Sequence, residues 1–191
     1  MAHPTQLMAR DAAILVIDVQ EKLMVKIPTA AAITRNIAFL LDAAKLLEVQ
    51  IAATEQYPKG LGPTVKPLAD RLPHRPDKLA FSSCGAPGVV ETFRDKGRDK
   101  IVLAGIETHV CVLHTTLDLL AAGFHVYLAV DALASRYAID HETALRRLEK
   151  AGAVLTTSET CAFEWMGGSQ HPQFKAVSAL VQERMKAMAQ S

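Results

Sequence analysis

Short apolar runs with strand character alternate with longer segments of helical periodicity along the chain. Residues 12–18 are almost continuously hydrophobic and end in Asp18, a pattern typical of a strand that is covered on both faces. Residues 30–49 instead place apolar side chains at helical spacing, which predicts a helix with one buried stripe. This alternation of strands and helices favours an α/β fold built on a parallel sheet.

The rest of the chain continues the alternation. The segment TEQYPKGLGP, rich in proline and glycine, is predicted to be a loop over the strand ends. The turn at residues 105–110 leads into a predicted helix, so Cys111 is expected in the first turn of that helix. Further strands are expected at 50–54, 78–82, 100–104, 125–130 and 153–156, and further helices at 111–122, 140–151 and 174–189.

Length and charge narrow the range of partners. A chain of 191 residues fits one domain, which we expect to span 1–191, because single cores usually grow to roughly 250 residues before they divide. The 21 Lys and Arg residues nearly balance the 20 Asp and Glu residues. We therefore expect a small-molecule substrate, and neither a nucleic acid nor a membrane as partner.

Cysteine usage and the first residues point to a cytoplasmic protein. The three cysteines form no CxxC pair, so neither a disulfide framework nor a cysteine-rich zinc site is indicated. The first residues lack the basic and then apolar layout of a signal peptide, and no apolar run approaches the roughly 20 residues that span a bilayer. The histidines show no regular ligand spacing, so no metal site is predicted.

Two residues at strand ends are candidates for chemistry. Asp18 closes the first strand at the edge where open parallel sheets bind ligands. Cys111 would lie at a helix N-terminus, where the helix dipole favours a thiolate. If the first and fourth strands are neighbours, both residues meet in one crevice, as a nucleophile beside a base. Lys78 near Asp18 would hold it ionised, although the spacing alone does not place it there.

Structural roles compete with each of these assignments. An aspartate at a strand end is more often a turn residue, and a lone cysteine is more often a buried hydrophobe. Either His109 or His114 could serve as the base of Cys111, or simply pack or face solvent. The other two cysteines, Cys84 and Cys161, are expected to be packing residues.

Four segments together resemble the isochorismatase-like cysteine hydrolase superfamily. They are LVIDVQ at 15–20, DKLAFS at 77–82, LAGIETHVCV at 103–112 and VDALASR at 130–136, in this order along the chain. The segment TEQYPKGLGPTV further resembles the branch of YcaC-like and isochorismatase domain-containing proteins. The resemblance implies a three-layer α/β/α sandwich with a six-stranded parallel sheet.

The resemblance also implies a set of site residues. It places the catalytic triad of the family on Asp18, Lys78 and Cys111. It further implies a cis peptide bond between Ile106 and Glu107, an oxyanion hole formed by the backbone amides of Glu107 and Cys111, and a substrate-binding role for Ile106, Glu107 and Gln20. The family tends to form oligomers, so a homo-oligomer is expected. The segment CAFEWMGG, with Trp165, is either an interface or an intramolecular packing element.

Two departures from the family pattern bear on the activity. Nicotinamidases of the superfamily bind a metal through an Asp-x-His pair, where this chain has Gln56 and Pro58. Many relatives also carry an aspartate where this chain has His109. No cofactor and no catalytic metal are therefore expected.

These observations predict a metal-independent cysteine hydrolase that acts on a small amide or a related carbonyl compound through a thioester. The thiol at position 111 favours acyl transfer, because the isochorismatases proper do not use a cysteine nucleophile whereas the amidohydrolases of the superfamily do. The alternative is a binding or scaffold protein that retains the fold without turnover and carries a redox-sensitive Cys111.

Overall fold

The computed structural model describes residues 3–189 and places six parallel strands in one sheet. Their order is β3-β2-β1-β4-β5-β6, so β1 and β4 are neighbours, as the candidate site requires. The strands are β1 (Ala12–Ile17), β2 (Gln50–Gln56), β3 (Asp77–Lys78), β4 (Lys100–Ile106), β5 (His125–Ala134) and β6 (Val154–Thr156). The order reverses between β1 and β4, which creates a crevice at their carboxyl ends.

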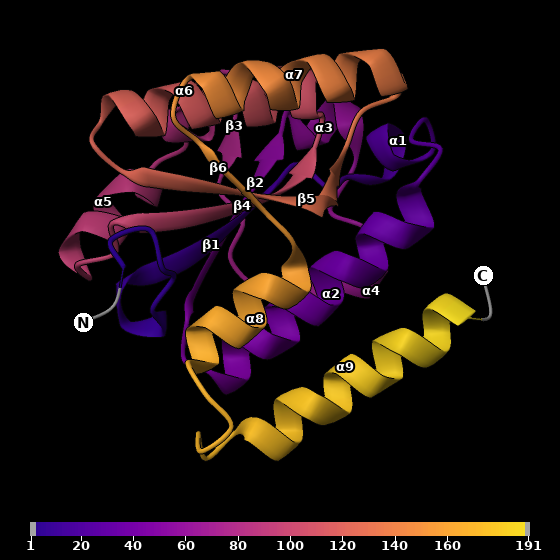
Figure 1. Ribbon diagram of the computed structural model, residues 1–191. Coiled ribbons are helices and arrows are strands. Elements are labelled where there is room, and N and C mark those ends of the chain that lie inside the picture. Colours follow the sequence, from indigo (N-terminus) through magenta and orange to yellow (C-terminus); the bar gives the residue numbers. More distant parts are fainter. Residues whose placement is uncertain (1–2, 190–191) are drawn as a thin grey trace.

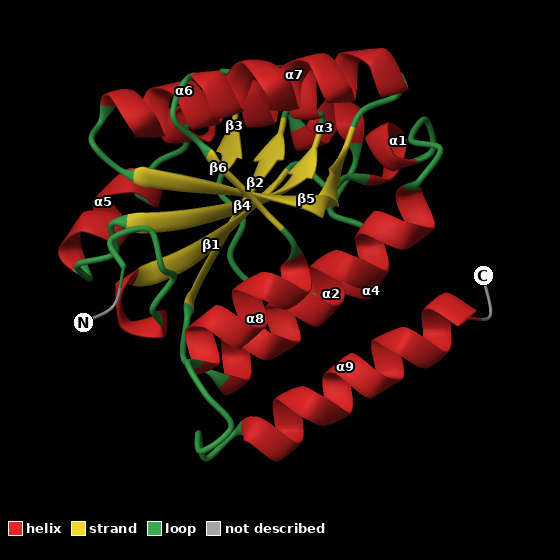
Figure 2. Ribbon diagram, viewed as in Figure 1, coloured by secondary structure: helices red, strands yellow, loops and turns green. Residues whose placement is uncertain are grey.

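Helices cover both faces of the sheet, giving the expected three-layer α/β/α sandwich (Figures 1 and 2). On one face α2 and α8 pack against the strands, and α9 lies outside them against α2 and α8; α5, α6 and α7 cover the other face. The longer helices are α2 (Ala30–Leu46), α5 (Val89–Asp95), α6 (Leu113–Ala121), α7 (Ala138–Lys150), α8 (Ser158–Met166) and α9 (Phe174–Ala189). Short helical turns are α1 (Glu21–Met24), α3 (Pro58–Leu61) and α4 (Lys66–Ala69), and 3-10 turns occur at Ala9–Asp11 and Ser83–Gly85.

The hydrophobic run of β1 is explained by its two covered faces. All six of its residues are buried. Ala12, Ile14 and Val16 belong to the core beneath α2 and α8, whereas the intervening residues belong to the core beneath α5 to α7. Successive side chains of a strand point to opposite faces, so a strand between two helical layers has no polar positions.

Several predicted boundaries are wrong in an informative way. The strand expected at 78–82 is limited to Asp77–Lys78, and the segment after it curls round the Lys78 ammonium group, which donates to the carbonyls of Ala80 and Phe81. The loop after the second strand is shorter than expected, because β2 continues to Gln56 and α3 follows it. The strands predicted at 100–104 and 125–130 extend to Ile106 and Ala134.

Trp165 is buried in the core under α8 and α2, with 3% of its surface exposed. Of the two roles considered for CAFEWMGG, the structure therefore gives Trp165 the intramolecular packing role. None of the helices within residues 3–189 is long and apolar enough to cross a membrane.

Candidate active site

Asp18 lies directly after β1, in the crevice between β1 and β4. Its backbone has a φ of 53°, a left-handed conformation that aspartate tolerates better than most residues. This conformation turns the chain out of the sheet immediately after the last strand residue. The side chain is fully buried, and its Oδ1 accepts a hydrogen bond from Thr54 Oγ1 at 2.9 Å.

Lys78 reaches the same point from the end of β3. Its Nζ lies 2.6 Å from Asp18 Oδ2, and both side chains are fully buried. The ammonium group also donates to Gln56 Oε1 at 2.7 Å and to the carbonyl of Phe81 at 3.0 Å. A buried charge is tolerated only when it is paired and hydrogen-bonded, and Lys78 meets both conditions.

Cys111 is carried by a π-helical turn, Thr108–Val112, that precedes α6. The expectation of a helix that starts at Cys111 is therefore wrong: Val112 N bonds to Glu107 O, and regular α-helix begins only at Leu113. Single π-turns of this kind occur frequently at functional sites. The Cys111 thiol is close enough to Asp18 and Lys78 that hydrogen bonding with both shifts its pKa.

The thiol is neutral at rest, contrary to the expectation of a stabilised thiolate. Burial, and after it the nearby Asp18 charge, raise the pKa of Cys111 to about 12 although Lys78 opposes both effects. The positive charge of Lys78 is already offset by Asp18 at 2.6 Å. Ionisation of Cys111 therefore requires a proton acceptor at the sulfur, and Asp18 is placed to be one.

β4 approaches β1 closely where the site forms. Gly105 of β4 pairs with Ile17, and a Cβ atom on Gly105 would lie 2.1 Å from the carbonyl oxygen of Ile17. Only glycine permits this approach, and the φ of +120° at Gly105 also requires it. The close contact brings the end of β4, and with it the turn that bears Cys111, beside Asp18.

The turn that follows β4 has the conformation that the family resemblance implied, with a cis peptide bond between Ile106 and Glu107. The Glu107 carboxylate is buried and accepts hydrogen bonds from the backbone N of Arg136 at 3.0 Å and from its Nε at 2.9 Å. Thr108, next in the chain, pairs with the ring of His141 at 2.9 Å. Contacts to the segment between β5 and α7, and to α7 itself, thus hold the proposed oxyanion turn in place.

Gln20 is fully buried, and its amide contacts the backbone of the strand-end loops. Its Nε2 donates to the carbonyls of Gln56 and Gly62, and its Oε1 accepts from Gln56 N. Gln20 therefore fixes the backbone of Gln56, whose side chain in turn accepts a hydrogen bond from Lys78. A direct contact between Gln20 and a substrate stays a prediction.

The two histidines near Cys111 have other partners. His109 Nδ1 lies 2.9 Å from Ser135 Oγ, and its Nε2 lies 3.8 Å from Asp140. The ring of His114 faces that of Phe81, with the centroids 5.8 Å apart. Of the three possible bases, these contacts favour Asp18.

The other two cysteines lie away from the triad residues. Burial raises the pKa of both, to about 12 for Cys161, which is fully enclosed under α8. Cys84 lies in the 3-10 turn after β3 and is half-buried. Both contribute to or pack against the hydrophobic core, as expected for packing residues.

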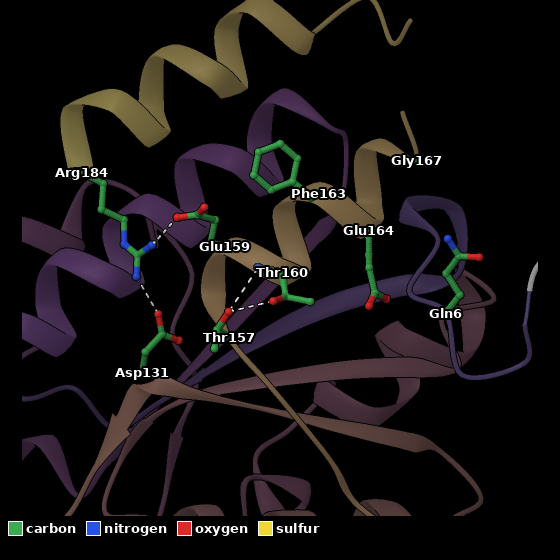
Figure 3. A pocket seen from close by; sticks show the side chains of 9 residues that line it. All are labelled: Gln6, Asp131, Thr157, Glu159, Thr160, Phe163, Glu164, Gly167 and Arg184. Atoms are coloured by element: carbon green, nitrogen blue, oxygen red, sulfur yellow. Dashed lines mark hydrogen bonds and ion pairs between the residues drawn. The ribbon is translucent and has the colours of Figure 1, made fainter. Parts of the chain in front are cut away.

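A cavity of about 660 Å³ lies elsewhere, between α8, α9 and the N-terminal segment (Figure 3). Arg184 of α9 lines this cavity and pairs with Asp131 at 2.8 Å and with Glu159 at 2.9 Å. These two ion pairs join α9 to β5 and α8, so the charged groups of the cavity serve largely to hold α9. In the part of the chain that the structure describes, no group of three or more His, Cys, Asp and Glu side chains is placed to hold a metal ion.

Sequence reasoning missed the hydroxyl residues behind Asp18. Thr54 contacts Asp18 directly, and Ser83 contacts Thr54 at 3.0 Å. Serine and threonine are too common for either to stand out in a sequence. The strand register supplies the missing signal, because Thr54 pairs with Ile17, the last residue of β1.

Comparison with known proteins identifies the family to which this chain belongs. The isochorismatase domain model matches residues 12–160. The isochorismatase domain-containing protein 2 of Xenopus laevis is 41% identical over 176 residues, which cover 91% of this chain and 85% of that protein.

Solved structures show the same fold. The MAR1 ribonuclease of Caenorhabditis elegans is 42% identical with a TM-score of 0.87, and the match covers 93% of each chain. The YcaC gene product of Escherichia coli, described as an octameric hydrolase of unknown specificity, is 24% identical with a TM-score of 0.86, covering 100% of this chain and 98% of that one. This chain therefore belongs to the isochorismatase-like hydrolase superfamily, in the branch of the isochorismatase domain-containing proteins.

Proposed function

We propose that this protein is a metal-independent cysteine hydrolase that cleaves a small amide or a related carbonyl compound through a thioester on Cys111. The observation that carries the proposal is the fully buried Asp18–Lys78 pair, 2.6 Å apart, beside a thiol whose ionisation responds to both charges. A carboxylate, an ammonium group and a thiol in one crevice form a nucleophile with its base. A thiol whose pKa is as strongly raised as that of Cys111 is a frequent feature of active sites.

The first half of the reaction acylates Cys111. Because the pKa of the thiol is about 12, its proton passes to Asp18 as the sulfur attacks the carbonyl carbon. Lys78 stabilises the negative charge that moves from the carboxylate to the sulfur. When the tetrahedral intermediate collapses, Asp18 returns the proton to the leaving nitrogen, the C–N bond breaks, and ammonia or an amine departs.

The second half releases the acid. Water attacks the thioester carbonyl and gives a proton to Asp18, and the C–S bond then breaks as that proton returns to the sulfur. In both halves the backbone amides of Glu107 and Cys111 are proposed to donate to the oxyanion. One such donor is typically worth about 3 to 4 kcal/mol of transition-state stabilisation.

Metal independence follows from the residues at the positions where nicotinamidases hold a metal. Pro58 has no ligand atom in its side chain, and the side-chain Oε1 of Gln56 accepts a hydrogen bond from Lys78. An amide oxygen that is committed to an ammonium group is a poor metal ligand. We expect activity to survive treatment with a chelator, and its loss together with a stoichiometric metal would refute this point.

A panel of primary amides tests the activity. Release of ammonia is measured for the wild-type protein and for the Cys111→Ala and Cys84→Ala variants. We expect turnover in the wild type and in Cys84→Ala and none in Cys111→Ala, with an acyl adduct on Cys111 detected by intact-protein mass spectrometry. Equal turnover in all three proteins would contradict the nucleophile assignment.

Two further measurements distinguish amide hydrolysis from other possible functions. Because one relative is named a ribonuclease, an RNA substrate is included. RNA cleavage that persists in Cys111→Ala while no amide is turned over would overturn the proposal. An unreactive amide panel together with a readily oxidised Cys111 would favour a binding or scaffold protein.

We also propose that the chain forms a homo-oligomer. Large apolar side chains are exposed at Val25, Leu79, Phe81 and Ile139, with exposed fractions of 82%, 79%, 54% and 65%. Apolar surface of this kind is typical of protein interfaces when it is contiguous. Light scattering after size exclusion is expected to give a multiple of 20.7 kDa, and a monomer would contradict the proposal.

A further inference from the structure

A chain of hydrogen bonds joins the Asp18 carboxylate to the backbone of Cys111. Thr54 Oγ1 donates to Asp18 Oδ1 at 2.9 Å and lies 3.0 Å from Ser83 Oγ. Ser83 N donates to Thr115 Oγ1 at 2.8 Å, and Thr115 Oγ1 donates to the carbonyl of Cys111 at 2.7 Å. The proposed base and the proposed nucleophile are therefore linked by side chains that the proposed reaction does not use.

The three hydroxyl residues connect the segments on which the proposed triad lies. Thr54 belongs to β2 beside the end of β1, Ser83 follows β3, and Thr115 lies on α6 one turn after Cys111. Each of the three is almost completely buried, with 1% exposure at Thr54 and none at the other two. Buried hydroxyl groups that are fully hydrogen-bonded hold their neighbours rigidly.

The hydrogen bonds near Asp18 run in one direction. A hydroxyl group has one hydrogen, and an ionised carboxylate only accepts. Because Thr54 gives its hydrogen to Asp18, the hydrogen between Thr54 and Ser83 must come from Ser83. The hydroxyl hydrogen of Ser83 therefore points to Thr54 and that of Thr54 to the carboxylate, so the two residues orient the carboxylate together.

A threonine that bonds back to the preceding helical turn is common and does not by itself indicate function. Thr116 is such a case, since its Oγ1 donates to the carbonyl of Val112 at 2.8 Å and it is fully buried. It has the same side chain and burial as Thr115, but no hydrogen bond that leads to Asp18 is found for it in the described part of the chain. Thr116 is thus a matched control.

We propose that Thr54 and Ser83 are positioning residues that keep the Asp18 carboxylate aimed at the Cys111 thiol. The proposal rests on the proposed function, in which Asp18 accepts the thiol proton. Thr54 donates a hydrogen bond to Oδ1 and Lys78 donates one to Oδ2, so both carboxylate oxygens are held in place. Without Thr54 the carboxylate would be free to turn away from the thiol.

Alkylation of Cys111 by iodoacetamide tests this without a known substrate. The rate is measured by peptide mass spectrometry between pH 4 and pH 8, with Cys84 in the same sample as an internal control. Among the described residues, the ionisable side chains that face Asp18 are Lys78 from β3 and Cys111 itself. The reactive form, with the thiol proton on Asp18, holds as many protons as the resting form, so we expect the wild-type rate to be nearly independent of pH in this range.

The Thr54→Val variant removes the hydroxyl and keeps the shape of the side chain. We expect its rate to fall about tenfold at each pH, the typical effect of one hydrogen bond to a charged group. Thr54→Ser restores the rate, and Thr116→Val matches the wild type. With an amide that the wild type hydrolyses, kcat of Thr54→Val is expected to fall about tenfold while KM stays within twofold.

The outcomes separate the two proposals. A wild-type rate that rises about tenfold per pH unit shows that the thiol ionises without Asp18 as its base, and it overturns both. A nearly pH-independent wild-type rate that Thr54→Val leaves unchanged overturns the positioning role alone. If Thr54→Val does not fold, Ser83→Ala takes its place, because it removes the donor to Thr54, and the same comparison applies to it.

Discussion

Removing one charge of the Asp18–Lys78 pair is predicted to lower the free energy of unfolding more than removing both charges. Asp18→Asn leaves the Lys78 ammonium group buried beside amide and carbonyl oxygens only, and Lys78→Met leaves a buried carboxylate with Thr54 as its remaining hydrogen-bond donor in the side-chain network. Breaking a buried pair from one side typically costs about 3 to 5 kcal/mol, because the partner stays charged without compensation. Replacing both members is often nearly neutral.

The structure sets the size of the expected effect. Both side chains have no exposed surface and their charged atoms lie 2.6 Å apart, so solvent screens neither charge. Each single variant should lose about 3 to 5 kcal/mol of unfolding free energy, out of the roughly 5 to 15 kcal/mol usual for a domain. The double variant should lose no more than either single one, which gives a coupling of at least about 3 kcal/mol.

Urea unfolding at one protein concentration measures these values, with the fluorescence of the buried Trp165 as the signal. With a slope of about 2 to 3 kcal/mol per molar urea, the unfolding midpoint of each single variant should lie about 1 to 2.5 M urea below that of the wild type. The surface pair Arg71–Asp42, at 2.8 Å but partly exposed, is the control and should show coupling below about 1 kcal/mol. Additive losses at Asp18 and Lys78 would refute the reasoning.

Three further predictions concern other parts of the molecule. Gly105→Ala should destabilise the protein by more than about 3 kcal/mol or prevent folding, because its Cβ would meet Ile17 O at 2.1 Å; thermal unfolding and soluble yield check this. Arg184→Met should cost about 2 to 4 kcal/mol and expose α9 to limited proteolysis, because this side chain joins α9 to Asp131, Glu159 and Asn36. In the native protein a bulky disulfide reagent should modify Cys84 first and leave Cys161 intact until urea unfolds the chain, since Cys161 has no exposed surface.

The sheet and its helices were largely predictable from the sequence, because each depends on local periodicity. The boundaries of the terminal helix, Phe174–Ala189, and the start of β1 agree with the pattern. The helix Ser158–Met166 was missed, although Thr157 before it caps the helix by accepting from Thr160 N, a recognisable start signal. The strand expected at 78–82 failed because a buried ammonium group, rather than a neighbouring strand, binds the carbonyls of that segment.

The candidate site was predictable only in part. Asp18 and Cys111 stand out because each follows a strand, but their proximity depends on the order of strands, which periodicity does not contain. The π-helical turn and the raised pKa of Cys111 were not predictable, since both arise from packing around the thiol. The hydroxyl chain behind Asp18 joins residues 18, 54, 83 and 115, and only the folded structure brings positions so distant in sequence together.

The raised pKa of Cys111 and the buried charge pair beside it have one consequence when taken together. A thiol with a pKa of about 12 holds about a thousandfold less thiolate at neutral pH than one with a pKa near 9, so the resting site resists chance alkylation and oxidation. In the proposed reaction, reactivity then depends on the transfer of one proton to Asp18, a step that fails if the carboxylate turns away. The hydrogen bonds from Thr54 and Lys78 oppose this failure. A buried ion pair contributes little net stability, so the geometry around Asp18 is better explained by control of this proton than by the needs of folding.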